Sequence, residues 1–552
     1  MRRTILCVLV IVFAIPTMIF ATGSQEASGE RVGSAPGPLG AYDAPITMTW
    51  AVPTSPVNQL LDGDTYDDNR WSQLYAEKLN IDLEVAFTAD STTAAYDNKL
   101  NAVIASGDLP DVFRTANFSV FTELALNDQV ADISSPYDEY ATASVKAFQE
   151  RFTDAFEGVS LRGGLYGIPR MNDNFHNAPF LWIRDDWLEN TGSEPPETVE
   201  EMVELARLFA TGDPDGNGVD GDTYGLTMSN GLLAQNHTSV RGLFSAFGVP
   251  GQGSGIFYRD ASGDITYSWI QPELKEALSL LNQMYEEGLV NEEFTANGLN
   301  DLIEDITSGR VGMAYGSNWG TWYPYNLVYQ RDGVITRAYP VPTIPGRPYR
   351  VGISSNKGGA VTVLRAGYEY PEAMIKMLNL YDETVNGGGQ DGYATYWANE
   401  QYRLSPIYID LPNEVYQTDL NESFRTGSSD NLTPFALRSY EYVIGFGDGD
   451  GPLKDDPNAY GTWGQMNPDG SLNVVLQKYI PDGAVVQNIM AQTVPEVWRT
   501  NVAVLETLTL TTFTDIIIGA RPVDAFDTYV EQWLRAGGQA TLDALEEIYP
   551  EE

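Results

Sequence analysis

The residues best suited to chemistry in this 552-residue sequence lie in one loop, where oxygen-bearing side chains alternate along the chain. Asp213, Asp215 and Asn217 stand at alternate positions, so their side-chain oxygens can converge on one centre. Gly216 and Gly218 allow the backbone to curl around that centre. Calcium takes about six to eight oxygen ligands of this kind, and the spacing therefore favours a calcium site.

The remaining ligands of this site cannot be assigned from the spacing alone. The twelfth position counted from Asp213 is Tyr224, where an EF-hand has a bidentate glutamate. Either Asp220 or Asp222 must then complete the ligand shell, together with the backbone carbonyl of Val219. The alternative is a hydrated turn without an ion, because Asp, Asn and Gly residues form such turns readily.

Hydrophobic patterning predicts the elements that position this loop. The loop follows an amphipathic helix over Glu197–Ala210, which itself follows an apolar strand over Phe180–Arg184. Nearer the N-terminus, strands alternate with helices, which is typical of a mainly parallel, doubly wound sheet. These earlier elements are Ile46–Val52, Asn69–Leu79, Ile81–Thr88, Thr93–Ser106 and Asp111–Thr115.

The first residues have the pattern of a secretory signal. Arg2 and Arg3 precede an apolar run over Ile5–Phe20, and the small residue Ala21 ends it. We expect cleavage after Ala21 and export. The single cysteine, Cys7, lies inside the apolar run and not at the cleavage point, so we expect neither a lipid anchor nor a disulfide in the mature chain.

The charge balance excludes several classes of partner. The chain has 76 Asp and Glu against 32 Lys and Arg, a net charge of −44. Such a charge repels nucleic acid and anionic membrane surfaces. With only two histidines, His176 and His237, neither a Ser-His-Asp triad nor a multi-histidine metal site is expected.

Five motifs in order resemble those of the extracellular solute-binding proteins of ABC sugar importers, in particular the subgroup of LplA-type and alginate-oligosaccharide-binding proteins. They are SGDLPDVF (106–113), LYGIPR (165–170), WIRDDWLENTG (182–192), ETVEEMVELARLFATGDPDGNGVDGDTYGL (197–226) and GRVGMAYGSNW (309–319). The resemblance implies an α/β, two-lobe periplasmic-binding-protein fold of type II, with mainly parallel sheets and a ligand cleft between the lobes.

The resemblance also implies a function and a metal. It implies capture of a carbohydrate, such as an oligosaccharide, and its delivery to the membrane permease of an ABC importer by a monomeric protein. It places one structural calcium ion at Asp213, Asp215, Asn217, Val219 and Asp222. Because the sequence has no cysteine at the cleavage point, the resemblance points to a periplasmic location.

We expect the following division of the chain. Residues 1–21 form the signal peptide and 22–41 a flexible leader. Residues 42–157 and 310–365 form the first lobe, and residues 158–309 and 366–552 form the second. After a helix expected over Tyr370–Thr384, we expect the chain up to Tyr460 to consist mainly of loops, because it is rich in Tyr, Trp, Asn and Gly.

A sugar cleft combines aromatic rings, which stack on CH faces, with polar side chains that hydrogen-bond hydroxyls. Aromatic and polar residues near strand ends and near the crossing between lobes are therefore candidates. Arg170, with its planar guanidinium, also suits a uronate carboxylate. The candidates are Trp50, Asn117, Arg170, His176, Trp319, Trp322, Trp397 and Trp463, whereas Trp182 in its apolar strand is expected to lie in the core.

Two other functions compete with this interpretation. A secreted glycoside hydrolase needs a pair of carboxylates across a cleft, and no local motif singles one out. A calcium-stabilised adhesion protein predicts repeats or the strand spacing of a β-sandwich, and the sequence has neither.

Overall fold

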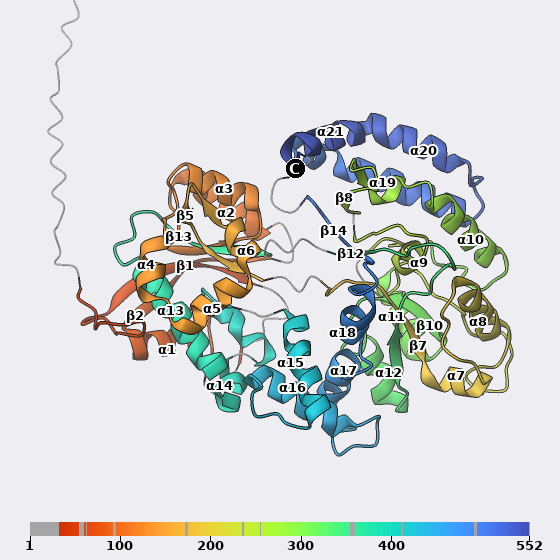
Figure 1. Ribbon diagram of the computed structural model, residues 1–552, viewed down its shortest axis with the longest axis horizontal. Helices are drawn as coiled ribbons and strands as arrows, with labels where there is room; N and C mark the ends of the chain where they lie inside the picture. Colours follow the sequence, from red (N-terminus) through yellow and green to blue (C-terminus); the bar gives the residue numbers. More distant parts are fainter. Residues whose placement is uncertain are drawn as a thin grey trace, which may run out of the picture.

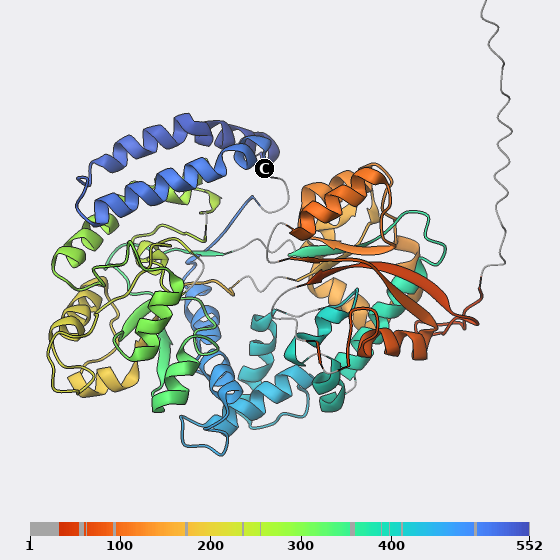
Figure 2. The same cartoon turned by 180° about the vertical axis from the view of Figure 1, so that it is seen from behind.

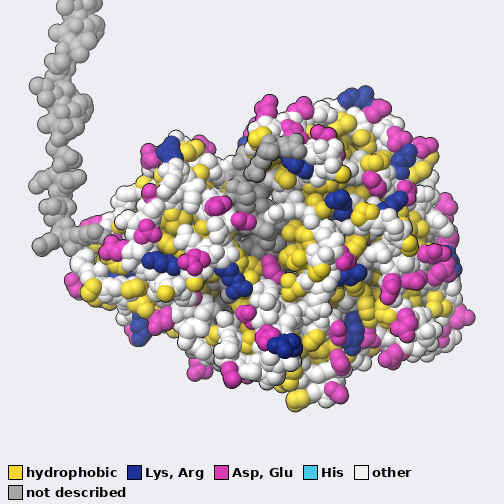
Figure 3. Space-filling view, viewed as in Figure 1, with side chains coloured by type: hydrophobic (Ala, Val, Ile, Leu, Met, Phe, Trp, Pro, Cys, Tyr) yellow, Lys and Arg dark blue, Asp and Glu magenta, His cyan; other side chains and the backbone are white. Residues whose placement is uncertain are grey.

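The computed structural model describes residues 32–54, 60–61, 63–91, 95–171, 175–234, 237–253, 255–353, 359–387, 389–396, 398–409, 412–490 and 494–550. Two lobes lie side by side, and a group of helices lies below both in the views of Figures 1 and 2. We call this group, α15–α18, the helical bridge. Acidic side chains are spread over both lobes and outnumber basic ones on the face in Figure 3.

The first lobe is built on a five-stranded sheet with the order β2-β1-β3-β13-β6. β1 pairs in parallel with β2 and β3, and β13 runs antiparallel to both β3 and β6. Helices cover both faces of the sheet (Figure 1). The elements of this lobe are β1 (Ile46–Thr54), α1 (Arg70–Leu79), β2 (Ile81–Asp90), α2 (Ala95–Ser106), β3 (Val112–Thr115), α3 (Phe118–Leu126), α4 (Ser134–Tyr140), α5 (Ala143–Arg151), α6 (Thr153–Gly158), β4 (Ser160–Leu161), β5 (Gly164–Leu165), β6 (Ile168–Arg170), β13 (Ala360–Leu364), α13 (Glu372–Asp382) and α14 (Gly389–Tyr396).

The second lobe has a three-stranded sheet with β7 between β10 and β11. Its elements are β7 (Phe180–Arg184), α7 (Asp185–Thr191), α8 (Val199–Thr211), α9 (Arg241–Ala246), β8 (Phe257–Arg259), β9 (Ile265–Tyr267), α10 (Leu274–Glu286), α11 (Leu299–Ser308), β10 (Met313–Gly316), α12 (Tyr325–Asp332), β11 (Thr336–Tyr339), β12 (Val351–Ile353), β14 (Val485–Gln487), α19 (Glu496–Ile517), α20 (Ala525–Trp533) and α21 (Gln539–Ile548).

The prediction of mainly parallel sheets is correct for β1, β2 and β3 but wrong for the second sheet. There β7 pairs antiparallel with both β10 and β11. α12 connects β10 to β11, and these two strands run parallel to each other. β7 lies between them and runs in the opposite direction. Every pair in this three-stranded sheet is therefore antiparallel. Parallel pairing occurs elsewhere in the second lobe, between β12 and β14 and in isolated bridges such as Thr227 with Ala314 beside β10.

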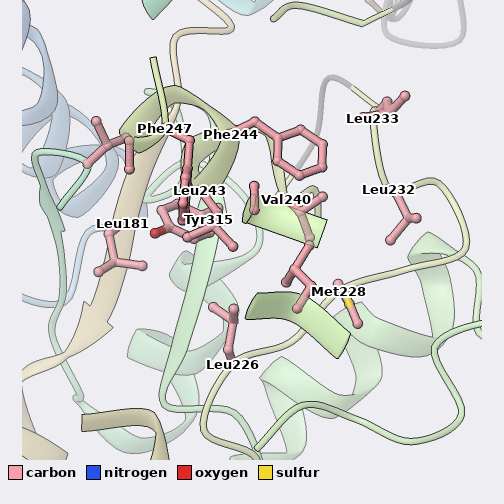
Figure 4. Close-up of a cluster of buried hydrophobic side chains, with 14 of the residues drawn as sticks. Leu181, Leu226, Met228, Leu232, Leu233, Val240, Leu243, Phe244, Phe247 and Tyr315 are labelled. Carbon is pink, nitrogen blue, oxygen red and sulfur yellow. The ribbon is translucent and has the colours of Figure 1, made fainter. Parts of the chain in front are cut away.

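The core of the second lobe joins the sheet to α9. Trp182 has no exposed surface, which confirms its predicted place in the core. Leu181 of β7, Tyr315 of β10 and the apolar face of α9 converge in Figure 4 with side chains from the segment before α9. That segment supplies Leu226, Met228, Leu232 and Leu233.

The hydrophobic clusters divide the chain differently from our expectation. The buried side chains between residues 311 and 353 belong to the second-lobe core, although we assigned 310–365 to the first lobe. Those between residues 361 and 409 belong to the first-lobe core, although we assigned 366–552 to the second. The crossings therefore fall close to where β6 and β12 end, because β13 returns to pair with β3 and β6.

The expectation of loops up to Tyr460 is also wrong. The helical bridge contains α15 (Asn413–Thr426), α16 (Pro434–Phe446), α17 (Pro457–Met466) and α18 (Ser471–Val474). Its apolar cluster unites Phe446, Tyr460 and Trp463. Burial of these rings outweighs the weak helix propensity of the Gly and Asn residues around them.

None of the helices in the described part of the chain combines the length and apolar character needed to cross a membrane.

Candidate functional site

A cavity of about 340 Å³ opens at one edge of the first-lobe sheet. Pro53 of β1, Arg114 of β3 and Arg170 at the end of β6 line it. Parallel strands bring their carboxyl ends to the same edge, and open α/β sheets bind ligands there. The other lining residues are Ser91, Tyr96, Asp97, Ala116, Gly359, Ala360 and Arg403. We call this site the arginine cavity.

Tyr408 holds two of the guanidinium groups of this cavity. Arg114 stacks over its ring at 4.3 Å and donates Nη1–H to its hydroxyl at 3.0 Å. The guanidinium of Arg170 lies over the same ring at 5.6 Å. Because Tyr408 is buried in the first-lobe core, the two arginines are held by a rigid platform.

The wall formed by α2 contributes a neutral hydroxyl and a carboxylate. The hydroxyl of Tyr96 donates to the backbone oxygen of Arg114 at 2.9 Å. Burial raises the pKa of Tyr96 to about 12, so its hydroxyl stays protonated at neutral pH. Asp97, the next residue, is the one carboxylate among the described lining residues.

An aromatic and polar group lies on the second lobe after β10. The ring of Trp319 stacks on that of His176, with centroids 5.7 Å apart, and meets His237 edge-on at 4.2 Å. Both ring nitrogens of His237, both amide atoms of Asn318 and Nε1 of Trp319 are buried without a hydrogen-bond partner in the described chain. Buried polar atoms nearly always have partners, so these groups are suited to bind hydroxyls.

His237 is neutral in this environment. Burial lowers its pKa to about 3, and the nearby His176 and Arg241 add to the shift. A neutral imidazole carries one donor and one acceptor nitrogen, and its charge does not change near neutral pH.

The two groups of residues lie at opposite ends of one crossing. Arg170 ends β6, the first-lobe strand that precedes this crossing, and His176 stacks on Trp319 in the second lobe. Six peptide units of extended chain span at most about 22 Å. Of the predicted binding residues, His176 and Trp319 are in direct contact, and Arg170 lies six positions before His176 in the sequence.

The other candidates from the sequence have structural roles or lie elsewhere. Trp50 and Trp463 are 2% and 4% exposed and belong to hydrophobic cores, so their assignment to the cleft is corrected. Asn117 caps α3 by accepting from the backbone amides of Ser119 and Val120. Trp397 lies outside the described residues.

Trp322 is packed against the helical bridge. Its Nε1–H donates to Oε1 of Gln465 at 3.1 Å, and its ring covers Gly461. The ring is 38% exposed, but it lies on the bridge and has its hydrogen bond already.

Sequence analysis missed Arg114, Arg403 and Tyr408. Arg114 carried a usable signal, because it is a charged residue near the carboxyl end of the third predicted strand, where ligand sites form. Arg403 and Tyr408 had no such signal, since only the return of the chain from β13 brings them to this edge.

The carboxylates of the Asp/Asn/Gly loop after α8 accept hydrogen bonds from amides of the same loop. Asn217 Nδ2 donates to Asp215 at 3.0 Å and to Asp222 at 2.9 Å, and the amide of Gly218 donates to Asp213 at 3.0 Å. Burial raises the pKa of Asp215, and Asp213 and Asp222 nearby add to the shift. Oδ1 of Asp213 is buried without a partner among the described residues.

The backbone of this loop curls as the sequence predicts. Gly216 and Gly218 have φ of 70° and 87°, in the region that favours glycine. The donors are oxygen-rich and fit calcium in type. As placed, however, no three or more His, Cys, Asp or Glu side chains in the described chain are arranged around a single metal position.

Comparison with known proteins agrees with the two-lobe fold. The chain is 23% identical to Lipoprotein LipO of Bacillus subtilis over 483 residues, covering 85% of this chain and 86% of LipO. It is 24% identical to the fructooligosaccharide ABC transporter substrate-binding protein FusA of Streptococcus pneumoniae over 433 residues, covering 75% and 74%.

Solved structures share the fold at low sequence identity. FusA in complex with kestose superposes with a TM-score of 0.60 at 16% identity, covering 91% of this chain and 99% of FusA. The alginate-binding protein AlgQ2, solved without calcium ion, superposes with a TM-score of 0.58 at 15% identity, covering 92% and 99%. A FusA EF-hand mutant in complex with fructo-nystose also superposes, with a TM-score of 0.58 at 16% identity and coverage of 91% and 99%.

The family profile described as bacterial extracellular solute-binding protein matches residues 60–381, which is more than half of the chain. This match includes the described residues that line the arginine cavity, except Pro53 and Arg403, together with the crossing at Arg170 and the aromatic group at Trp319. The chain belongs to the bacterial extracellular solute-binding protein family.

Proposed function

We propose that this protein captures an oligosaccharide between its two lobes and delivers it to the membrane permease of an ABC importer. The observation that carries the proposal is the pairing, across one crossing, of the arginine cavity with the aromatic group of His176 and Trp319. Aromatic rings beside hydrogen-bonding side chains are the combination that sugars require. The sugar-binding function of the relative FusA supports the same ligand class.

The mechanism is a shift between open and closed arrangements of the lobes. A ligand that contacts both lobes stabilises the closed arrangement, and only a difference in affinity between the two arrangements moves the equilibrium. The permease then distinguishes the closed, loaded protein from the open one.

The arrangement favours binding over hydrolysis. Glycoside hydrolysis needs two carboxylates about 5 to 10 Å apart across the sugar. Asp97 is the one carboxylate among the described residues that line the arginine cavity. We therefore propose a protein without catalytic activity.

A panel of neutral and acidic oligosaccharides tests this function. Stoichiometric binding in calorimetry, with a change in tryptophan fluorescence and no product by chromatography, is the expected result. Release of shorter sugars would establish the hydrolase instead. If no sugar in the panel binds, the proposed function fails.

We further propose that the loop from Asp213 to Asp222 holds one structural calcium ion. Asp213, Asp215, Asn217 and Asp222 would supply side-chain oxygens and Val219 its carbonyl, and the ion would neutralise carboxylates that repel one another. The loop joins the end of α8 to Tyr224, which bridges to Val311 beside β10. Calcium would thus hold the second lobe rigid. The name of the FusA EF-hand mutant supports this proposal.

We also propose export to the periplasm with cleavage after Ala21. The apolar run and the position of Cys7 support this location. Mass spectrometry of the exported chain is expected to give an N-terminus at Thr22, and a lipid-modified chain would contradict the proposal.

A further inference from the structure

The arginine cavity has an unusual charge for this protein. The whole chain has 32 Lys and Arg against 76 Asp and Glu. Among the ten described residues that line the cavity, three are arginines and one is an aspartate, so the charge balance of these residues is the reverse of that of the whole chain. A locally positive potential at a ligand site attracts an anionic ligand.

Arg114 has no anionic partner in the described chain. Its guanidinium donates to the hydroxyl of Tyr408 at 3.0 Å and to the carbonyl oxygen of Pro406 at 3.4 Å, both neutral acceptors. Its Nε is buried without an acceptor among the described residues. A half-buried guanidinium bonded only to neutral groups is left able to bind a carboxylate.

Arg365 lies at the opposite end of the strands of the same sheet, and unlike Arg114 it has a carboxylate partner among the described residues. Its Nη2 and Nε donate to Oδ1 of Asp111 at 2.6 and 3.2 Å. That carboxylate also accepts from the backbone amide and hydroxyl of Thr49. Within the described part of the chain, Arg365 thus has a carboxylate partner and Arg114 has none.

Tyr408 holds the guanidinium groups of the cavity in fixed orientations. The guanidinium groups of Arg114 and Arg170 both make cation–π contacts with its ring, and Arg403 lines the same cavity. A planar guanidinium held in this way presents paired N–H groups that match a carboxylate better than a hydroxyl. The cavity volume, about 340 Å³, is within the range of small-ligand sites.

We propose that the ligand is an acidic oligosaccharide and that Arg114 binds a uronate carboxylate in the arginine cavity. This inference rests on the proposed function and narrows its ligand class.

The test compares each uronide with a partner that lacks only the charge. Oligogalacturonides, mannuronate and guluronate oligomers and glucuronate-containing oligosaccharides of three to six sugars are titrated by calorimetry, each beside its methyl ester. A sulfated neutral oligosaccharide and neutral oligosaccharides complete the set. At least one uronide is expected to bind about tenfold or more tightly than its ester, with weaker binding as salt rises from about 20 to 300 mM.

The variant Arg114→Gln is expected to remove most of that preference while the affinity for the ester stays within about threefold. Arg365→Gln is the matched control: it removes an arginine from the other end of the strands of this sheet and is expected to leave the preference unchanged. Because the salt dependence is measured on the wild-type protein, the inference stays falsifiable even if Arg114→Gln folds poorly.

The outcomes separate this inference from the proposed function. Equal or tighter binding of esters or neutral sugars, or of the sulfated sugar alone, overturns the uronate inference and leaves the sugar-binding function in place. Binding of no sugar overturns both. A preference that survives Arg114→Gln in a folded protein overturns the role of Arg114.

Discussion

The indole of Trp319 lies nearly parallel to the imidazole of His176, with ring centroids 5.7 Å apart and planes at 20°. The two rings come from different parts of the second lobe: His176 lies just after the crossing from β6, and Trp319 lies after β10. The contact fastens the start of the second lobe to its central sheet.

Replacing Trp319 by Ala is expected to weaken sugar binding by about 1 to 3 kcal/mol, because a sugar loses a stacking surface and buried apolar area. Calorimetry with the best ligand of the panel measures the loss. The melting temperature should change little, since the ring is only partly buried. Trp322→Ala is the control, because Trp322 packs on the helical bridge. An unchanged affinity would remove Trp319 from the site.

Replacing Trp463 by Ala is expected to act on stability and not on binding. The ring is 4% exposed, packs on Phe446, and lies 4.7 Å from the guanidinium of Arg337. Its removal leaves a cavity in the helical bridge and should lower the free energy of unfolding by about 3 to 5 kcal/mol. Urea unfolding measures this loss. A stable variant with weakened sugar affinity would instead place Trp463 in the cleft.

His237 is expected to make the protein less stable in acid. Its pKa of about 3 in the folded protein lies below the value near 6.5 of an exposed histidine. The unfolded chain therefore binds a proton first as pH falls, and stability decreases from about pH 6.5 downward. At pH 5 the cost is about 2 kcal/mol for this residue. His237→Gln should flatten the change in melting temperature between pH 7 and 5, and an unchanged slope would contradict the buried neutral state.

Calcium is expected to raise the melting temperature, and a chelator should reverse the shift. Saturation at 100 times the dissociation constant stabilises the folded state by about 2.7 kcal/mol. Asp215→Asn and Asp222→Asn should abolish the shift. Asp220→Asn is the control, because Asp222 and not Asp220 shares the amide of Asn217. If calcium does not change the melting temperature of the wild-type protein, the proposed calcium site is excluded.

Local patterning was sufficient to predict several individual elements in the first half of the chain. The helix predicted over Asn69–Leu79 is α1, whose capping box joins Asn69 to Ser72, and the strand predicted from Ile81 is β2. Trp182 and Gly218 were also placed correctly, because an apolar strand and a glycine turn depend on residues close in sequence. Trp50 and Trp463 were not, since a ring near a strand end or in a polar segment looks the same whether it faces ligand or core.

The sequence by itself determined the family motifs, the α/β elements and the Asp/Asn/Gly loop, because each depends on the order and spacing of neighbouring residues. Only the tertiary structure decided the arginine cavity. Arg114, Arg170 and Arg403 lie on three separate segments, and the return of the chain through β13 brings them to one edge of one sheet. Which side chains meet there depends on contacts between residues hundreds of positions apart, and no local pattern records those contacts.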